Sequence, residues 1–184
     1  MRARSFCAVL AFAVASQTTD ILAQTPPSPQ TPPTAAASSS ADDALRQTAM
    51  ALLFARVIGV TGIEKAPTGA VKQLSLDVAE RSTHLLSELA TAVKSSGAPV
   101  QLPTSLDASL RDKAELLQSS FESQFEHEYL DMQIAAHRQA VAALGAGGVS
   151  TQPAAVSAVT KRIAAEMSKN LAALETIKRQ LPAM

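Results

Sequence analysis

Apolar residues recur at intervals of three and four along most of the chain after Asp42, and no segment alternates residue by residue as a strand would. This spacing predicts helices, because it places the apolar side chains on one face of each helix. Four helices are expected, over residues 42–63, 69–96, 105–144 and 151–180, with a break in the third near Ser119 and Ser120. Gly97 is a typical helix stop after the second. The pattern predicts an all-α protein, and the short connections favour an antiparallel four-helix bundle.

Several polar side chains fall inside the apolar faces of these helices. They are Ser82, Tyr129, Gln133, His137 and Asn170. Buried polar groups are normally hydrogen-bonded, so we expect these residues to have structural roles. The helix lengths place Asn170 nearer to Tyr129 and Glu126 than to His137. A hydrogen bond from Asn170 to Tyr129 or Glu126 is therefore predicted.

The N-terminal segment, residues 1–23, has the pattern of a secretory signal peptide. Arg2 and Arg4 precede a short apolar stretch, and cleavage is expected after Ala23, with Ala15 as the alternative. That stretch is well short of the roughly 20 apolar residues that span a membrane. Residues 24–40 are mainly Pro, Ala, Ser and Thr, which bury too little surface to fold, so a disordered linker is predicted. The bundle domain is expected over residues 41–184.

Composition narrows the range of partners. The chain has 16 basic and 16 acidic side chains, and 3 % of its residues are aromatic. This composition provides neither a basic footprint nor a base-stacking surface for nucleic acid. The single cysteine, Cys7, lies within the predicted signal peptide. The mature chain is therefore expected to have no disulfide, thiolate metal site or cysteine nucleophile.

The run Phe125-Glu126-x-x-Tyr129-Leu130-x-x-Gln133-x-x-x-His137 resembles the third-helix motif of a bacterial exported "predicted outer membrane protein" family, domain of unknown function 4142. Val71-Lys72-Gln73-Leu74 and the loop Gly97-x-Pro99-x-x-Leu102-Pro103 are similar to its second helix and the turn that follows. The resemblance covers roughly residues 44–181. It implies a ferritin-like bundle in the periplasm or at the outer membrane of a Gram-negative bacterium, with no established biochemical activity.

An aromatic packing stripe is also expected on the third helix. Phe121, Phe125 and Tyr129 are spaced by four residues, which places them on one side of a helix. The motif that carries the resemblance overlaps this stripe. It is better evidence for the fold than for any chemistry.

Ferritin-like bundles often hold metal ions, but few ligands are present here. Family members typically carry inward histidines where this chain has Ser82 and Asn170, so His137 is the one inward imidazole left. The chain contains no Glu-x-x-His motif of a di-iron site. Glu122 and Glu126 share a side of the third helix with His137, and these three are weak metal candidates. The alternative is that the carboxylates lie at a wet edge and His137 hydrogen-bonds across the bundle.

No catalytic residue and no cofactor is predicted. Ser82 and His137 have no orienting acid and no recognisable oxyanion site, and helix arithmetic separates Asn170 from His137. The leading hypothesis is an exported, non-catalytic protein of the cell envelope with a binding or structural role. One alternative is a periplasmic metal-binding or metal-storage protein with a degenerate ferritin-like site.

A second alternative is a helix-mediated interaction or sensor module. Residues 49–60 of the first helix form a nearly continuous apolar run, which usually marks a buried helix. A dimer surface or a membrane contact is the remaining option for this run. The expected partner is an envelope protein or a second copy of the chain, and not nucleic acid. No transmembrane segment is expected in the mature chain.

Overall fold

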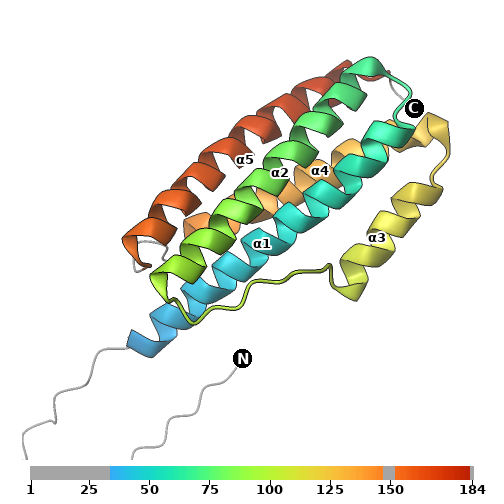
Figure 1. Cartoon of the computed structure of the whole chain (residues 1–184). Coiled ribbons are helices and arrows are strands. Elements are labelled where there is room, and N and C mark those ends of the chain that lie inside the picture. The colour runs from blue at the N-terminus through green and yellow to red at the C-terminus, as the bar shows by residue number, and fades with distance from the viewer. Residues whose placement is uncertain (1–33, 147–151, 183–184) are drawn as a thin grey trace, which may run out of the picture. The chain divides into compact units, whose positions relative to one another are not determined.

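A computed structural model describes residues 34–146 and 152–182, which form five helices and no strand. The helices are α1 (Thr34–Lys65), α2 (Gly69–Ser96), α3 (Ala108–Ser119), α4 (Glu122–Ala146) and α5 (Ala154–Gln180) (Figure 1). The predicted all-α class is confirmed, and so is the break at Ser119 and Ser120. The predicted signal peptide and the first part of the predicted linker lie outside the described residues.

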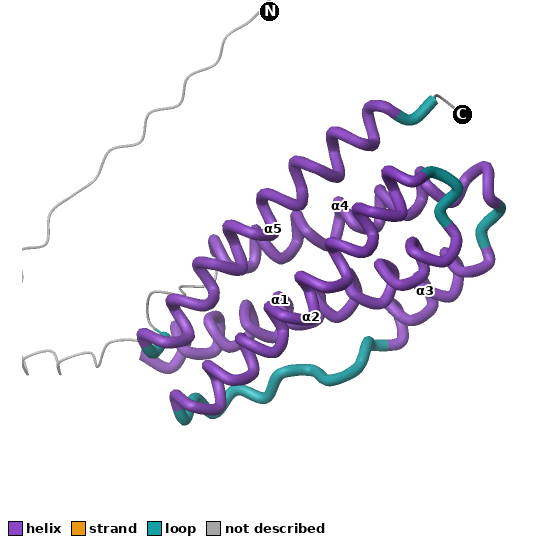
Figure 2. The backbone as a smooth tube through the Cα atoms, turned by 45° about the horizontal axis from the view of Figure 1, so that its top comes forward, coloured by secondary structure: helices purple, strands orange, loops and turns teal. Residues whose placement is uncertain are grey.

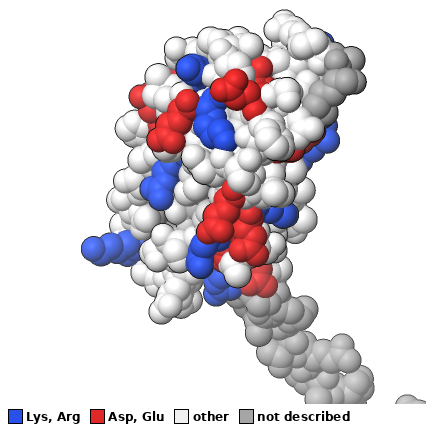
Figure 3. Space-filling view, turned by 90° about the vertical axis from the view of Figure 1, so that its right-hand side faces the viewer, with Lys and Arg blue, Asp and Glu red and all other residues white. Residues whose placement is uncertain are grey.

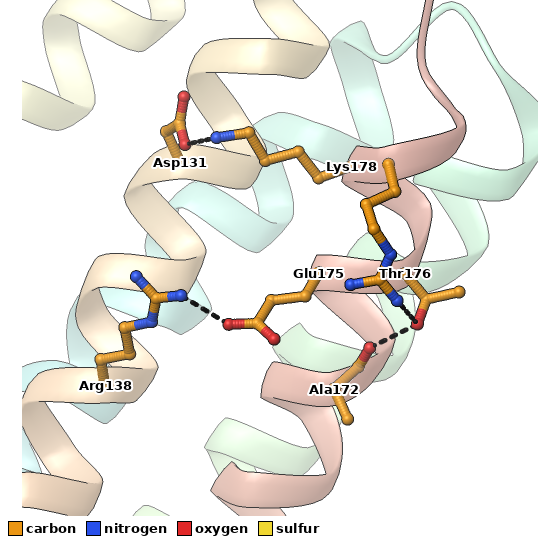
Figure 4. Close-up of polar contacts among 7 residues, drawn as sticks. Asp131, Arg138, Ala172, Glu175, Thr176 and Lys178 are labelled. Carbon is orange, nitrogen blue, oxygen red and sulfur yellow. Dashed lines mark hydrogen bonds and ion pairs between the residues drawn. The ribbon is translucent and has the colours of Figure 1, made fainter.

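The four long helices pack as two antiparallel pairs, α1 with α2 and α4 with α5 (Figures 1 and 2). Two ion pairs show that α4 and α5 are antiparallel: Arg138 of α4 meets Glu175 of α5, and Asp131 of α4 meets Lys178 of α5 (Figure 4). Between the pairs, residues 97–121 return along the side of the bundle as an extended loop followed by α3 (Figure 2). The predicted four-helix bundle is thus formed with one long crossover between its pairs.

The predicted break at Ser119 and Ser120 makes α3 a separate helix. Ser120 has an extended backbone (φ −61°, ψ 147°) that ends α3 before α4 begins. Lys65, at the end of α1, donates to the carbonyl oxygens of Gln118 and Ser120, groups that a helix end leaves without a partner. Leu117 is the one buried residue of α3. This short helix therefore lies on the outside of the four long helices, against α1 and α4.

α1 begins at Thr34 and not near Asp42, so residues 34–40 of the predicted disordered linker are helical. Their low hydrophobicity suggested disorder. However, Ala35, Ala36 and Ala37 fall in this segment, and alanine is the residue that favours a helix most. The next proline after Pro33 is Pro67, beyond the end of α1, so no proline interrupts this helix.

The apolar run of α1 lies in the core of the bundle. Ala49, Leu52, Ala55 and Ile58 are completely buried. The stretch Ser40–Lys65 is long and apolar enough to cross a membrane by length and composition alone, and 67 % of its most apolar window is buried inside the bundle. This burial is typical of a core helix. Of the alternatives that the sequence left open for this run, a buried helix is therefore the one that the structure shows.

Charged side chains of both signs are interspersed on the face shown in Figure 3. Ion pairs such as Arg81 with Glu166 (2.7 Å) and Arg138 with Glu175 (2.6 Å) link α5 to its neighbours. These pairs are partly exposed to solvent, so each contributes only about 0–1 kcal/mol. The bundle therefore depends on its core for stability.

α1 approaches α2 and α4 closely at Gly62. A Cβ atom built on Gly62 would lie 2.2 Å from Ser75 Oγ and 2.9 Å from Tyr129 Cε2. Both distances are too short for any side chain other than hydrogen. Gly62 therefore allows Ser75 and Tyr129 to pack directly against the backbone of α1.

The variant Gly62→Ala is expected to destabilise the protein by about 1–3 kcal/mol, because Ser75 and the Tyr129 ring must move apart. Urea unfolding of the two proteins measures the difference. Gly145→Ala is the matched control, since Gly145 also lies in a helix and has open space around it. That control is expected to be neutral or more stable by up to about 1 kcal/mol. Equal stability of Gly62→Ala and the unchanged protein would contradict the close packing.

Candidate functional site

Tyr129 is the centre of a buried hydrogen-bonded chain that joins three helices. It lies in α4 and is completely buried. The amide nitrogen Nε2 of Gln133, also in α4, donates to the Tyr129 hydroxyl (3.3 Å) and to the backbone oxygen of Ala55 in α1 (3.0 Å). Ser75 of α2 is the second hydrogen-bonding neighbour of the Tyr129 hydroxyl. The Ser75 hydroxyl itself donates to Val71 O (2.7 Å). The chain therefore ties α4 to both α1 and α2.

This environment keeps Tyr129 uncharged. Burial raises the pKa of the Tyr129 phenol to about 12, because a phenolate would lose its hydration. Hydrogen bonds with Ser75 and Gln133 offset part of that effect. The phenol therefore acts as a neutral hydrogen-bonding group at physiological pH.

The predicted aromatic stripe is formed in part. The Phe125 and Tyr129 rings stack, with centroids 6.0 Å apart and an interplanar angle of 10°. Phe121, by contrast, is 77 % exposed, so its predicted place in the stripe is wrong. α4 begins at Glu122, one residue later, and the Phe121 side chain does not follow the helical spacing.

His137 is a second polar residue that is completely buried. Its Nδ1 lies 2.8 Å from the backbone oxygen of Gln133, which requires the proton to be on Nδ1. Burial lowers the pKa of His137 to about 4, and the hydrogen bond to Gln133 offsets only part of this effect. His137 is therefore a neutral imidazole with its Nε2 lone pair inside the bundle.

Three buried polar atoms have no hydrogen-bond partner among the described residues: Thr48 Oγ1, Gln133 Oε1 and His137 Nε2. Gln133 and His137 are one helical turn apart on α4, and both unpartnered atoms are acceptors. A buried polar group without a partner costs roughly 1–3 kcal/mol. The buried polar atoms of the bundle therefore find only part of their hydrogen-bond partners among the described residues.

Glu126 anchors the start of α2. Its Oε1 accepts hydrogen bonds from the backbone nitrogen (2.8 Å) and the hydroxyl (2.6 Å) of Thr68. Thr68 is the N-cap of α2, and its hydroxyl oxygen accepts from Val71 N. A carboxylate is favoured at this position because the helix dipole makes the N-terminus positive. Glu126, only 8 % exposed, is thus already engaged in holding α2 against α4.

The weak metal candidates are not brought together. Glu122 is exposed, Glu126 binds Thr68, and His137 lies three turns further along α4. Eleven residues of helix separate Glu126 from His137 by about 16 Å, too far for one ion. In the described part of the chain, no group of three or more His, Cys, Asp or Glu residues is placed to hold a metal.

The predicted hydrogen bond from Asn170 to Tyr129 or Glu126 is not formed between these described residues. Glu126 binds Thr68, and Tyr129 bonds with Gln133 and Ser75. The prediction was wrong because it assumed that the C-terminal end of α4 is level with the N-terminal end of α5.

The ion pairs between α4 and α5 give the true register. Because Glu175 meets Arg138 and Lys178 meets Asp131, Asn170 is level with about residues 139–143 of α4. It lies at least about 15 Å along the bundle from Tyr129. Asn170 and Ser82 are both buried, as predicted, but no hydrogen bond links either of them to His137 in the described residues.

An apolar crevice, which helical periodicity did not predict, lies beneath α3, between α1 and α4. Its volume is about 410 Å³. Its walls include Met50 and Phe54 of α1, Leu110 and Leu116 of α3, and Met132 of α4. The sequence of α3 does indicate a helix at the surface. Four of the five residues from Arg111 to Glu115 are charged, which is typical of a helix with only a narrow buried face.

The described part of the chain is thus a helical bundle with a buried polar interior and an apolar crevice beneath its crossover helix. By sequence, the chain matches the family described as domain of unknown function (DUF4142) over residues 26–177, and it belongs to that family. The family expected from the third-helix motif is confirmed. No curated protein and no solved structure matches the chain.

Titration of Tyr129 is expected to show ionisation near pH 12 in the folded protein and near pH 10 after unfolding in urea. Tyr129 is the only tyrosine and the chain has no tryptophan, so phenolate absorbance reports this residue alone. Because the folded state holds the proton more tightly, stability should fall as pH rises from about 10 to 12. In Ser75→Ala the hydroxyl loses a partner that lowers its pKa, so ionisation should move higher still. Ionisation near pH 10 in the folded protein would contradict burial of the phenol.

Stability is also expected to fall as pH drops from 6.5 to about 4. The unfolded state binds a proton at His137 in this range while the folded state does not, which gives a loss of up to about 3 kcal/mol. Urea midpoints measured from pH 7.5 to 4.5 test this expectation. His137→Gln should flatten the profile, and His84→Gln, at an exposed position, should keep it. An unchanged profile in His137→Gln would show that His137 is not the group responsible.

Proposed function

We propose that the protein is an exported, non-catalytic binding protein of the bacterial cell envelope, with its binding site in the crevice beneath α3. The single observation that carries the binding role is the crevice itself. Its volume lies in the range of about 300–1,000 Å³ that small-molecule sites have, and apolar side chains form most of its lining. Polar groups at its rim, Gln47 and Gln139, are available to orient a ligand.

Burial of the polar core supports the non-catalytic part of the proposal. Ser82 is 1 % exposed and His137 is fully buried, so neither side chain meets a dissolved substrate. The proposed envelope location rests on the signal-like N-terminus. Two antiparallel pairs with one long crossover are also the connectivity of ferritin-like bundles, which supports that part of the resemblance.

Export is tested by producing the full chain in a Gram-negative cell and separating periplasm, membranes and cytoplasm. The protein is expected in the periplasmic or outer-membrane fraction. Mass spectrometry should find a chain that begins at Gln24, or at Ser16 if the alternative site is used. Full-length protein confined to the cytoplasm would overturn the proposed location.

Binding is tested with Leu116→Trp, which places a single tryptophan at the rim of the crevice. Addition of dodecanol, an uncharged apolar probe, is expected to shift its emission to the blue in a saturable way. Phe121→Trp is the control, because Phe121 is exposed and does not line the crevice. Ala135 lines the crevice but is exposed to solvent, so a larger side chain can be placed there without disturbing the core. In the reporter that also carries Ala135→Phe, the phenylalanine ring should occupy the crevice, and dodecanol should no longer shift the emission. A reporter that does not respond to the probe would overturn the proposed binding role.

A further inference from the structure

Resting on the proposed binding role, we propose that the crevice takes a small amphiphile with an apolar tail and an anionic head, of the fatty-acid type. The tail lies beneath α3 and the head lies at Lys113. This assigns the ligand class from the distribution of apolar and charged groups along the crevice.

The inner part of the crevice fits an alkyl chain. Phe54 and Ala51 of α1 and Ala136 of α4 form its floor, and all three are buried. Met50 and Met132 stand on either side, and methionine adapts its shape to flexible apolar partners. Leu116, 62 % exposed, lies on the rim, so a bound tail would also cover apolar surface that now faces water.

The other end of the crevice is polar and carries a free positive charge. Two charged residues line the crevice, Lys113 and Asp131. Asp131 forms an ion pair with Lys178 of α5, whereas Lys113 makes no ion pair with any described residue. The uncompensated charge at the site is therefore positive, which favours an anionic head group.

The position of Lys113 separates head from tail. A second crevice of about 650 Å³ adjoins the first. The two share Lys113, Gln47 and Gln139 together with Met50 and Leu110, whereas Asp131 and Phe54 line the first alone, and Arg46 and Asp107 line the second alone. The shared residues lie where the two crevices meet, and the floor residues Phe54, Ala51 and Ala136 line the first crevice alone. In the proposed arrangement the carboxylate lies at Lys113, on the part of the crevice that Gln47 and Gln139 also line, and the tail points toward Phe54 and Met132.

The test uses the Leu116→Trp reporter and a series of ligands below their micelle concentrations. From octanoate through decanoate to dodecanoate, the Kd is expected to fall about three- to fourfold for each added methylene. Dodecanoate should bind more tightly than dodecyltrimethylammonium, which has the same tail and the opposite charge. Adding Lys113→Gln should weaken dodecanoate about two- to fivefold, the size expected of an exposed ion pair, and leave dodecanol unchanged. Lys169→Gln, an exposed lysine on α5 away from the crevice, should change neither.

The outcomes separate this inference from the proposed function. If dodecanol binds as tightly as dodecanoate, or if Lys113→Gln leaves dodecanoate unaffected, the anionic head is wrong while the binding role stands. If no ligand of either kind shifts the reporter, both fail. A stable dimer in light scattering that takes up no ligand would instead assign the crevice to contact between two copies, and would overturn the amphiphile site.

Discussion

The burial of the Tyr129 hydroxyl is the constraint on which the rest of the bundle depends. A buried hydroxyl without partners would cost roughly 1–3 kcal/mol, so Tyr129 needs both Gln133 and Ser75. Ser75 and the Tyr129 ring fit side by side because Gly62 leaves room for both against α1. The side-chain amide of Gln133 also donates a hydrogen bond to the backbone oxygen of Ala55 in α1. One chain of polar contacts thereby sets the register of three helices, while the surrounding apolar residues tolerate small changes in shape.

The sequence predicted the helices and the burial of individual residues well, because both follow from a spacing of 3.6 residues per turn. The five polar residues expected inside the bundle are all buried. Their partners were harder to predict, since the sequence does not encode how far one helix slides along another. Asn170 was placed beside Tyr129 on the assumption that the end of α4 is level with the start of α5, and the ion pair of Arg138 with Glu175 shows otherwise. The prediction that Phe121 belongs to the aromatic stripe was wrong for a local reason, because Phe121 precedes the first turn of α4.

The crossover is the part of the fold that helical periodicity in the sequence could not predict. A break at Ser119 and Ser120 was visible in the sequence, but its consequence depended on the path of the loop before α3. Because that loop returns along the bundle, α3 packs on the outside of α1 and α4. Lys65 then holds the end of α3 through two backbone oxygens. The beginning of α3 is held by its own N-cap, Asp107, which contributes to the helix and not to its attachment.

The attachment of α3 explains why binding is more plausible at the surface than in the polar interior. Opening the interior at His137 would separate long helices whose apolar faces are fully buried. Among the residues of α3 itself, moving the helix would newly expose mainly Leu117, because the others are already partly or fully in contact with water. Segments with few buried contacts open at the lowest free energy. The ligand proposed to insert beneath α3 would therefore displace the least stable packing, and it would cover Leu116, which is 62 % exposed.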